Sequence, residues 1–259
     1  MKIVVCIKQV PAGTADKRYE ADLTLDRSVE SVINPLDEYA IEQALRLADA
    51  GSVDQVSYLS MGPEQANEAL RRALAMGGDD AYLVTDDALS GADEWATARV
   101  LAAALDKLAP DVALMGMASD DAKGSLVPGA VAAMRNVPLL SYGAELILAD
   151  GNARIRRLTA GGHDVLEAPL PVVASVTDQV GEPRYASLKG IMAAKRKPLE
   201  TWSLADIGLS DAELHGAALT RVLEAEPPEA KPPTERLEGA SADEAAAKIA
   251  DWLAARRLI

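Results

Sequence analysis

Short, continuously apolar runs alternate with helical patterns along the first half of the chain, and this alternation constrains the fold more than any other feature. The apolar runs cover residues 2–7, 56–60, 81–84 and 111–116. Runs of this length without polar interruption are typical of strands buried on both faces of a parallel sheet. Strand and helix in repeated alternation therefore predict a parallel sheet with right-handed crossovers.

The helical patterns carry clear start and stop signals. The first predicted helix begins with Asn34 as N-cap, Pro35 at the first helical position and Asp37 in the first turn, and Gly51 supplies its end. Further apolar stripes follow a tight turn at 61–64 and in the Ala/Leu-rich stretch 96–108. Each of these helices lies between two predicted strands, as the parallel arrangement requires.

The pattern changes after Pro138. Two alternating runs flank Asp150-Gly151, a dipeptide typical of hairpin turns, and residues 171–176 are apolar again. We expect an antiparallel excursion that rejoins the sheet. The predicted fold class is therefore α/β: a doubly wound, mostly parallel, Rossmann-like sheet with an antiparallel excursion and a C-terminal helical arm.

The C-terminal end differs in composition from the rest. We expect an α/β domain over 1–226, a stiff Pro-rich linker over 227–240 and a final helix over 241–259. That helix carries Ile249 and Trp252 on one face. We expect it to be an arm that docks on a partner subunit, the alternative being packing on its own domain.

Composition excludes several function classes. The chain has 26 Lys+Arg against 40 Asp+Glu, a formal net charge of −14, which argues against nucleic acid or anionic lipid as partner. One cysteine and two isolated histidines argue against a disulfide, an iron–sulfur cluster or a metal site. No run approaches the roughly 18–20 apolar residues of a membrane span. We expect a cytoplasmic protein without membrane insertion.

A basic cluster interrupts this acidic sequence. Residues 183–198 contain five cations and no acid, and Leu188, Ile191 and Met192 lie among them at near-helical spacing. The cluster is either a docking site for a charged partner or a surface helix on which Lys and Arg happen to lie together.

Candidate ligand loops follow the predicted strands, at the edge where open parallel sheets bind ligands. They are residues 8–13, 34–35, 60–63 and 116–125. The last is rich in Gly and Ser and leads into a helix, so its N–H groups could hold a phosphate, with Ser119 and Ser125 adding hydroxyls. Asp121 would bind a ribose hydroxyl or orient the loop. The alternative is an ordinary strand–helix connection, since both GxxxxGK[ST] and GxGxxG are absent.

No catalytic constellation accompanies these loops. No histidine lies near them to activate a nucleophile, and Asp120-Asp121 alone is typical of a solvated turn. Cys6 lies in a strand, which favours a buried, unreactive thiol. We read His163 as structural and assign no role to His215.

Six segments in the same order resemble the beta subunit of electron-transfer flavoprotein. They are residues 7–11, 33–40, 60–63, 72–77, 164–173 and 182–195, and the final helix resembles the C-terminal arm of that family. The resemblance implies a heterodimer with an alpha subunit that holds the redox FAD, while the beta subunit binds AMP structurally and catalyses nothing itself. It assigns the AMP pocket to Cys6, Asn34, Pro35, Leu36, Asp37, Met61, Gly116, Met117, Ala118, Ser119, Asp120, Asp121, Ala122, Lys123, Gly124, Ser125, Leu126 and Val127.

The chain departs from the family within that pocket. Members often have a Gln-Ala-Ile-Asp-Asp type of loop where residues 117–121 read Met-Ala-Ser-Asp-Asp. The change keeps an acid and small residues, so we expect backbone contacts to the phosphate to survive.

The resemblance also gives the basic cluster a role. Leu188 would anchor in an apolar pocket of an acyl-CoA dehydrogenase, and the partner-docking residues would be Arg184, Tyr185, Leu188, Ile191, Met192 and Lys195. Electrons would pass through the alpha-subunit FAD to electron-transfer flavoprotein–quinone oxidoreductase and the quinone pool, in fatty acid beta-oxidation. Two alternatives stay open: a bifurcating flavoprotein with a second FAD in place of AMP, and a stand-alone nucleotide-binding or ATP-hydrolysing protein.

Overall fold

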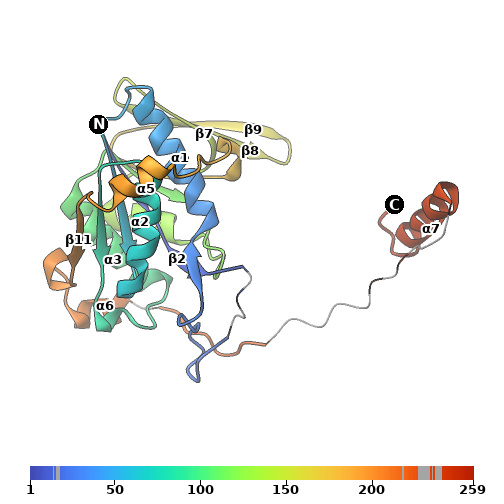
Figure 1. Ribbon diagram of the computed structural model, residues 1–259, viewed down its shortest axis with the longest axis horizontal. Coiled ribbons are helices and arrows are strands. Elements are labelled where there is room, and N and C mark those ends of the chain that lie inside the picture. The colour runs from blue at the N-terminus through green and yellow to red at the C-terminus, as the bar shows by residue number, and fades with distance from the viewer. Residues whose placement is uncertain (14, 16–17, 218, 227–233, 235, 237–240) are drawn as a thin grey trace. The chain divides into compact units, whose positions relative to one another are not determined.

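The computed structural model describes residues 1–13, 15, 18–217, 219–226, 234, 236 and 241–259 (Figure 1). Residues Met1–Leu223 form one compact unit and Glu224–Ile259 form a second. Almost all of the expected linker, except residues 234 and 236, lies outside the described residues.

A nine-stranded sheet organises the first unit. Its strands lie in the order β11 (Leu199–Trp202), β5 (Asp80–Val84), β4 (Gln55–Met61), β1 (Lys2–Cys6), β6 (Val112–Gly116), β10 (Val172–Val176), β7 (Leu139–Ala149), β8 (Asn152–Thr159) and β9 (Gly162–Pro169). Pairing is parallel from β11 through β7 and antiparallel from β7 to β9. The predicted parallel sheet with an antiparallel excursion is confirmed.

Helices cover both faces of the sheet, as expected for a doubly wound fold (Figure 1). Against one face lie α1 (Pro35–Asp49), α2 (Asn67–Met76) and α5 (Leu188–Ala194). Against the other lie α3 (Glu94–Leu108), α4 (Val127–Arg135) and α6 (Asp211–Ala217). Apolar side chains of β1 point to both faces of the sheet: Ile3 and Val5 belong to the first core and Val4 to the second. Helices must therefore cover both faces.

The hairpin between β7 and β8 has the predicted turn. Asp150 and Gly151 both have positive φ, at 50° and 75°, and the flanking pair Ala149–Asn152 closes the ladder. Two residues with positive φ form the turn whose twist matches antiparallel strands. The strand β10 then returns to the sheet between β6 and β7.

Several elements were not predicted, including β9, α6 and three short strands. The segment before residue 33 was expected to be a polar connection, yet β2 (Gln9–Pro11) and β3 (Ser31–Ile33) pair antiparallel as a separate small sheet. The edge strand β11 was also missed. Strands of three or four residues are too short to show a period in sequence. The described residues of this unit also contain single turns of 3-10 helix: η1 (Glu64–Ala66), η2 (Asp87–Leu89), η3 (Asp178–Val180) and η4 (Ala205–Ile207).

The second unit contains α7 (Ala242–Ala255). Ser241 caps it through a reciprocal pair of hydrogen bonds with Glu244. No residue of α7 is buried, and Ile249 and Trp252 are both about half exposed. Among the helices in the described ranges, none has the length and apolar character needed to cross a membrane.

Candidate functional site

Asn34 joins three segments at the carboxyl-terminal edge of the sheet. Its N–H donates to the carbonyl of Lys8 after β1 (2.8 Å). Its side-chain amide donates to the carbonyl of Ala118 (2.9 Å) and accepts from the N–H of Asp120 (3.0 Å). The residue is almost completely buried. Asn34 therefore holds the loop after β6 against the start of α1.

The predicted capping role of the Asn34 side chain is wrong. The residue occupies the N-cap position of α1, but its side chain makes no capping hydrogen bond. An amide can donate and accept at once, whereas an aspartate can only accept. The Asn34 amide donates to one backbone group of the loop and accepts from another, and so it does not cap α1.

Asp37 ties the same three segments together from the first turn of α1. Its buried carboxylate accepts from the Lys8 N–H (2.8 Å) and from the Gly116 N–H at the end of β6. Burial raises the pKa of Asp37 to about 7, although these hydrogen bonds and Lys8 oppose the shift. A Cβ on Gly116 would lie 2.5 Å from Asp37 Oδ1 and 2.6 Å from the Leu36 carbonyl oxygen. Only glycine allows this approach of β6 to α1.

Asp121 fixes the middle of the loop. Its side chain is 2% exposed and accepts from Lys8 Nζ (2.8 Å) and from the Arg27 guanidinium (3.3 Å). Burial alone would raise the pKa of Asp121, but Lys8, Ser119 and Arg27 outweigh it and hold the pKa below its ordinary value. The carboxylate therefore stays charged and orients the loop, which was one of the two roles that the sequence offered.

The second half of the loop leaves backbone donors free. Lys123 and Ser125 have positive φ (52° and 55°), and the N–H groups of residues 124–126 find no acceptor within the described residues. The Glu94 carboxylate fills the space beside Gly124, where a Cβ would fall 1.4 Å from Oε1, so residue 124 has no room for a side chain. Free N–H groups in such a turn, directly before a helix, are suited to an anion.

The remaining predicted pocket residues lie at the same edge. Cys6 ends β1, and burial raises the pKa of its thiol to about 12. Met61 ends β4 and packs against the core under α3 and α4. Pro35 begins α1 and Val127 begins α4. The structure thus brings the strand ends and helix starts together, with Cys6 in the role of a core residue.

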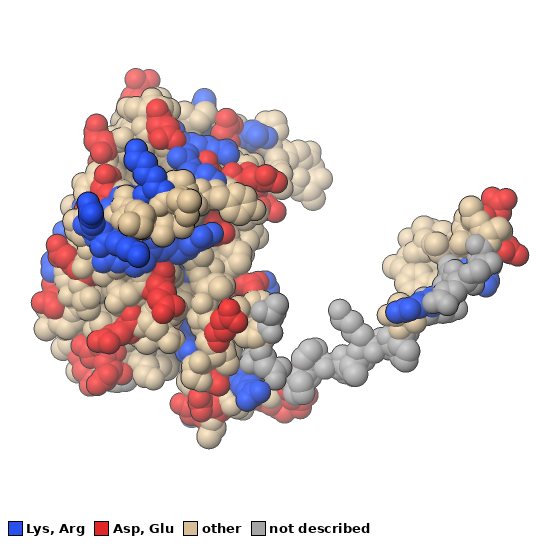
Figure 2. Space-filling model, in the orientation of Figure 1, with Lys and Arg blue, Asp and Glu red and all other residues tan. Residues whose placement is uncertain are grey.

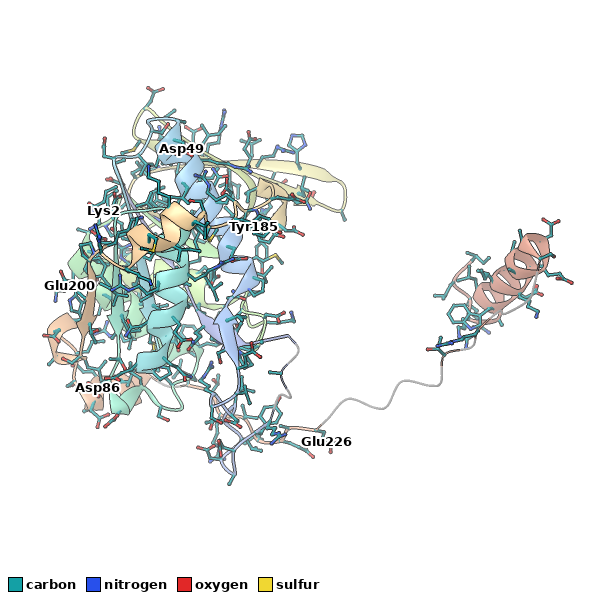
Figure 3. All side chains as sticks on the ribbon, viewed as in Figure 1. Lys2, Asp49, Asp86, Tyr185, Glu200 and Glu226 are labelled. Atoms are coloured by element: carbon teal, nitrogen blue, oxygen red, sulfur yellow. The ribbon has the colours of Figure 1, made fainter. Side chains whose placement is uncertain are left out.

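The basic cluster forms a short helix with an apolar outer surface. Ser187 caps α5 by accepting from the Gly190 N–H (3.0 Å). Tyr185 and Leu188 are 91% and 84% exposed, and Met192 and Ile191 are also exposed. In Figure 2, Lys and Arg side chains lie around the surface of α5. Figure 3 labels Tyr185, which lies near α1 in that view.

Comparison with known proteins shows which family this chain is similar to. A family model described as an electron transfer flavoprotein domain matches residues 22–207. The beta subunit of the electron transfer flavoprotein of Mycobacterium leprae is 36% identical over 267 residues, covering 99% of both chains. Subunit CarD of the caffeyl-CoA reductase–Etf complex of Acetobacterium woodii is 36% identical over 262 residues, covering both chains completely.

This chain belongs to the electron transfer flavoprotein family. The matching relative from Megasphaera elsdenii is also named as a beta subunit, at 35% identity over 83% of this chain and 82% of its own. The chain is therefore an electron-transfer protein of the beta-subunit type. Membership implies an alpha-subunit partner in a heterodimer, and an association with flavin and nucleotide.

Several contacts of this beta-type subunit were not found from sequence. Lys8 and Arg27 lie 113 and 94 positions from Asp121, the carboxylate that they pair with. In the basic cluster, Arg184 pairs with Glu42 and Asp49, and Lys197 donates to the Leu74 carbonyl. These cations are thus tied to their own domain.

The sequence also raised the two histidines and a metal site. His163 lies exposed in β9, and the side chain of His215 lies outside the described residues. Among the described residues, no three His, Cys, Asp or Glu side chains are grouped to hold a metal ion.

Proposed function

We propose that this chain is the beta subunit of a heterodimeric electron-transfer flavoprotein that binds AMP structurally. The observation that carries the proposal is the loop 116–127, which Asn34 and Asp121 fix in place while the N–H groups of residues 124–126 have no acceptor in the part of the chain that the structure describes. A phosphate supplies several acceptor oxygens to such a group of donors. AMP supplies no redox chemistry, so the electrons pass through the FAD of the alpha subunit.

The residues present fit a mononucleotide. The start of α4 and the turn at Lys123 and Ser125 offer donors for the phosphate, and the Ser125 hydroxyl adds another. Asn34 and Asp37 hold the strand ends and the loop together, and they do not bind the N–H groups of residues 124–126. No side chain of the loop resembles an acid–base pair, which agrees with a structural rather than a catalytic nucleotide.

The second part of the proposal is that α5 docks acyl-CoA dehydrogenases and related flavin dehydrogenases. An apolar side chain as exposed as Leu188 can anchor in a pocket of a partner, and the nearby Lys189 and Lys195 would speed encounter with an acidic surface. A carrier must release its partner quickly, and a small interface suits this better than a large one. Electrons would then pass to electron-transfer flavoprotein–quinone oxidoreductase and the quinone pool.

Cofactor content tests the nucleotide assignment. The chain is co-expressed with an alpha subunit, the heterodimer is purified, and the cofactors are extracted and quantified. We expect one FAD and one AMP per heterodimer. Two FAD and no AMP would contradict the proposal, as would a stable monomer that turns over ATP.

A bifurcating flavoprotein, with a second FAD in place of AMP, is the second candidate. One similar chain, from Acetobacterium woodii, is named as a subunit of a complex between a caffeyl-CoA reductase and an Etf. The same extraction separates the two candidates, because AMP and FAD compete for one site.

Leu188→Ala tests the docking assignment. We expect reduction of the heterodimer by an acyl-CoA dehydrogenase to slow by about tenfold, because an interface anchor contributes more than about 1 kcal/mol. The matched control is Leu158→Ala, which truncates a half-exposed leucine on β8 outside the docking segment. An unchanged rate in Leu188→Ala would remove the docking role.

The final helix completes the proposal as an arm that docks on the alpha subunit. Its half-exposed Ile249 and Trp252 are apolar surface that a partner would cover. Deletion of residues 234–259 should weaken assembly with the alpha subunit, measured by size-exclusion chromatography at falling concentration. A heterodimer of unchanged stability would show that the helix has another role.

A further inference from the structure

We propose that Glu42 is a positioning residue for the docking segment, residues 183–198, and that it holds this surface in its binding geometry before a partner arrives. The role rests on the proposed docking function of α5. Glu42 lies in the middle of α1 and has no exposed apolar surface to offer a partner. Its effect on docking would therefore pass through the residues that it holds.

Glu42 receives four hydrogen bonds from two arginines. Arg184 donates from its backbone N–H (3.0 Å), from Nε (2.7 Å) and from Nη2 (3.2 Å). Arg46 donates from Nε (2.8 Å). The Glu42 side chain is 5% exposed, and a buried carboxylate is tolerated only when its oxygens are satisfied in this way. Arg184 is thus fixed at both its backbone and its side chain, immediately before Tyr185.

Arg46, which also binds Glu42, holds the turn that precedes Arg184 in the chain. Its guanidinium donates to the carbonyls of Val180 (2.7 Å) and Glu182 (3.2 Å). It also lies so close to Gly181 that a Cβ there would fall 2.6 Å from Nη1. Through Arg46 and Arg184, the single carboxylate of Glu42 orders the chain from residue 180 to residue 184.

The far side of the docking segment is held by α2. Arg71 donates to the carbonyls of Ala194 (2.6 Å) and Lys197 (2.8 Å), where α5 ends. Gly190 lies against α2, because a Cβ there would fall 2.3 Å from the Ala75 carbonyl oxygen. The inner side of α5 is thus fixed at both ends and in the middle, while Leu188 and Met192 remain exposed.

This arrangement has a consequence for binding. A surface that is already ordered loses less conformational entropy when a partner docks, so more of the contact energy appears as affinity. Asp49 cannot replace Glu42, because it is 67% exposed and accepts from only one nitrogen of Arg184. Loss of the Glu42 charge would therefore free residues 180–188 and weaken docking.

The test is Glu42→Gln in the heterodimer with the alpha subunit. Glutamine keeps the shape, but its NH₂ group would face the arginine donors. We expect amide hydrogen exchange over residues 181–192 to accelerate by about tenfold, and the KM for reduction by an acyl-CoA dehydrogenase to rise while kcat and AMP content stay unchanged. Glu38→Gln, one turn earlier on α1, where the carboxylate lies 3.8 Å from Arg72 Nε, is the control.

A second variant, Arg184→Lys, tests the same contact if Glu42→Gln does not fold. It keeps the charge but loses the planar fork that binds Glu42 and Asp49, so we expect the same acceleration of amide exchange. Unchanged exchange over 181–192 in both variants would overturn the positioning role. Faster exchange with an unchanged KM would overturn its link to docking, and Leu188→Ala in the same assay would then show whether the docking function itself fails.

Discussion

The proposed nucleotide loop (116–127) and the proposed docking segment (183–198) are held by the same helix in different ways. The first turn of α1 holds the nucleotide loop through the Asn34 amide and Asp37, which bind backbone groups. The middle of α1 holds the docking segment through Glu42 and its arginines. Within the described residues, the loop is left with N–H groups that have no acceptor, and such groups suit a phosphate. The segment is left with exposed apolar side chains, which suit a protein.

Gly116→Ala should have a large effect that begins at the nucleotide loop. The new Cβ would collide with Asp37 and with the Leu36 backbone, which cannot move without shifting α1. We expect a loss of about 3 kcal/mol of unfolding free energy and loss of AMP from the heterodimer. Chemical denaturation and nucleotide extraction measure these. Normal stability and AMP content would show that the contact between β6 and α1 is not required.

Gly190→Ala is the corresponding change on the docking side. Its Cβ would meet the Ala75 carbonyl and push α5 away from α2. We expect about 1–2 kcal/mol of destabilisation and slower reduction by the dehydrogenase, with AMP content unchanged. Gly161→Ala, at a turn with open space around the α-carbon, is the control. Loss of AMP in Gly190→Ala would break the separation of the two regions.

Asp121→Asn tests the charge that fixes the nucleotide loop. The variant leaves Lys8 and Arg27 without their carboxylate, and we expect about 1–2 kcal/mol of lost stability together with faster AMP release. Because the pKa of Asp121 is lowered on folding, its contribution is present above the ordinary aspartate pKa and disappears as pH falls below it. Equal stabilities at neutral pH would contradict this role.

Asp37→Asn tests the raised pKa of Asp37, and its effect should be visible as a change in pH dependence. Because folding raises the pKa of Asp37 to about 7, the carboxyl favours the folded state below its unfolded pKa, near 4, and loses that advantage as pH rises through 7. Stability relative to wild type should therefore shift in favour of Asp37→Asn between about pH 4 and pH 7. Unfolding curves at several pH values measure the difference, and a constant difference would contradict the shift.

Sequence patterns predicted most of the regular secondary structure, where side-chain periodicity or turn chemistry gives a local signal. The buried strands, α1 to α4 and the Asp150-Gly151 turn follow from period, capping and turn chemistry, and the structure confirms them. The three-residue strands β2 and β3 leave no period to detect. The pairs Lys8–Asp121 and Glu42–Arg184 join distant positions, and nothing local in either residue signals its partner. The Asn34 capping role failed because a tertiary contact competed for the same amide.

In the candidate sites too, local patterns were predictable from sequence and long-range contacts were not. Placing loops at strand ends predicted that residues 34–37 and 116–121 would meet, because parallel strands end at one edge. Leu188 is exposed, and the contacts of Glu42 and Arg71 that fix the inner side of the docking segment join distant positions that no local pattern signals. A sequence shows which side chains a segment carries, but not which backbone groups remain free.

Hydrogen exchange on the heterodimer, with and without an acyl-CoA dehydrogenase, tests most directly whether the docking segment and the nucleotide loop are separate surfaces. We expect slower exchange over residues 185–194 when the dehydrogenase is present, and unchanged exchange over residues 116–127. Protection confined to the nucleotide loop, or none over residues 185–194, would contradict the account.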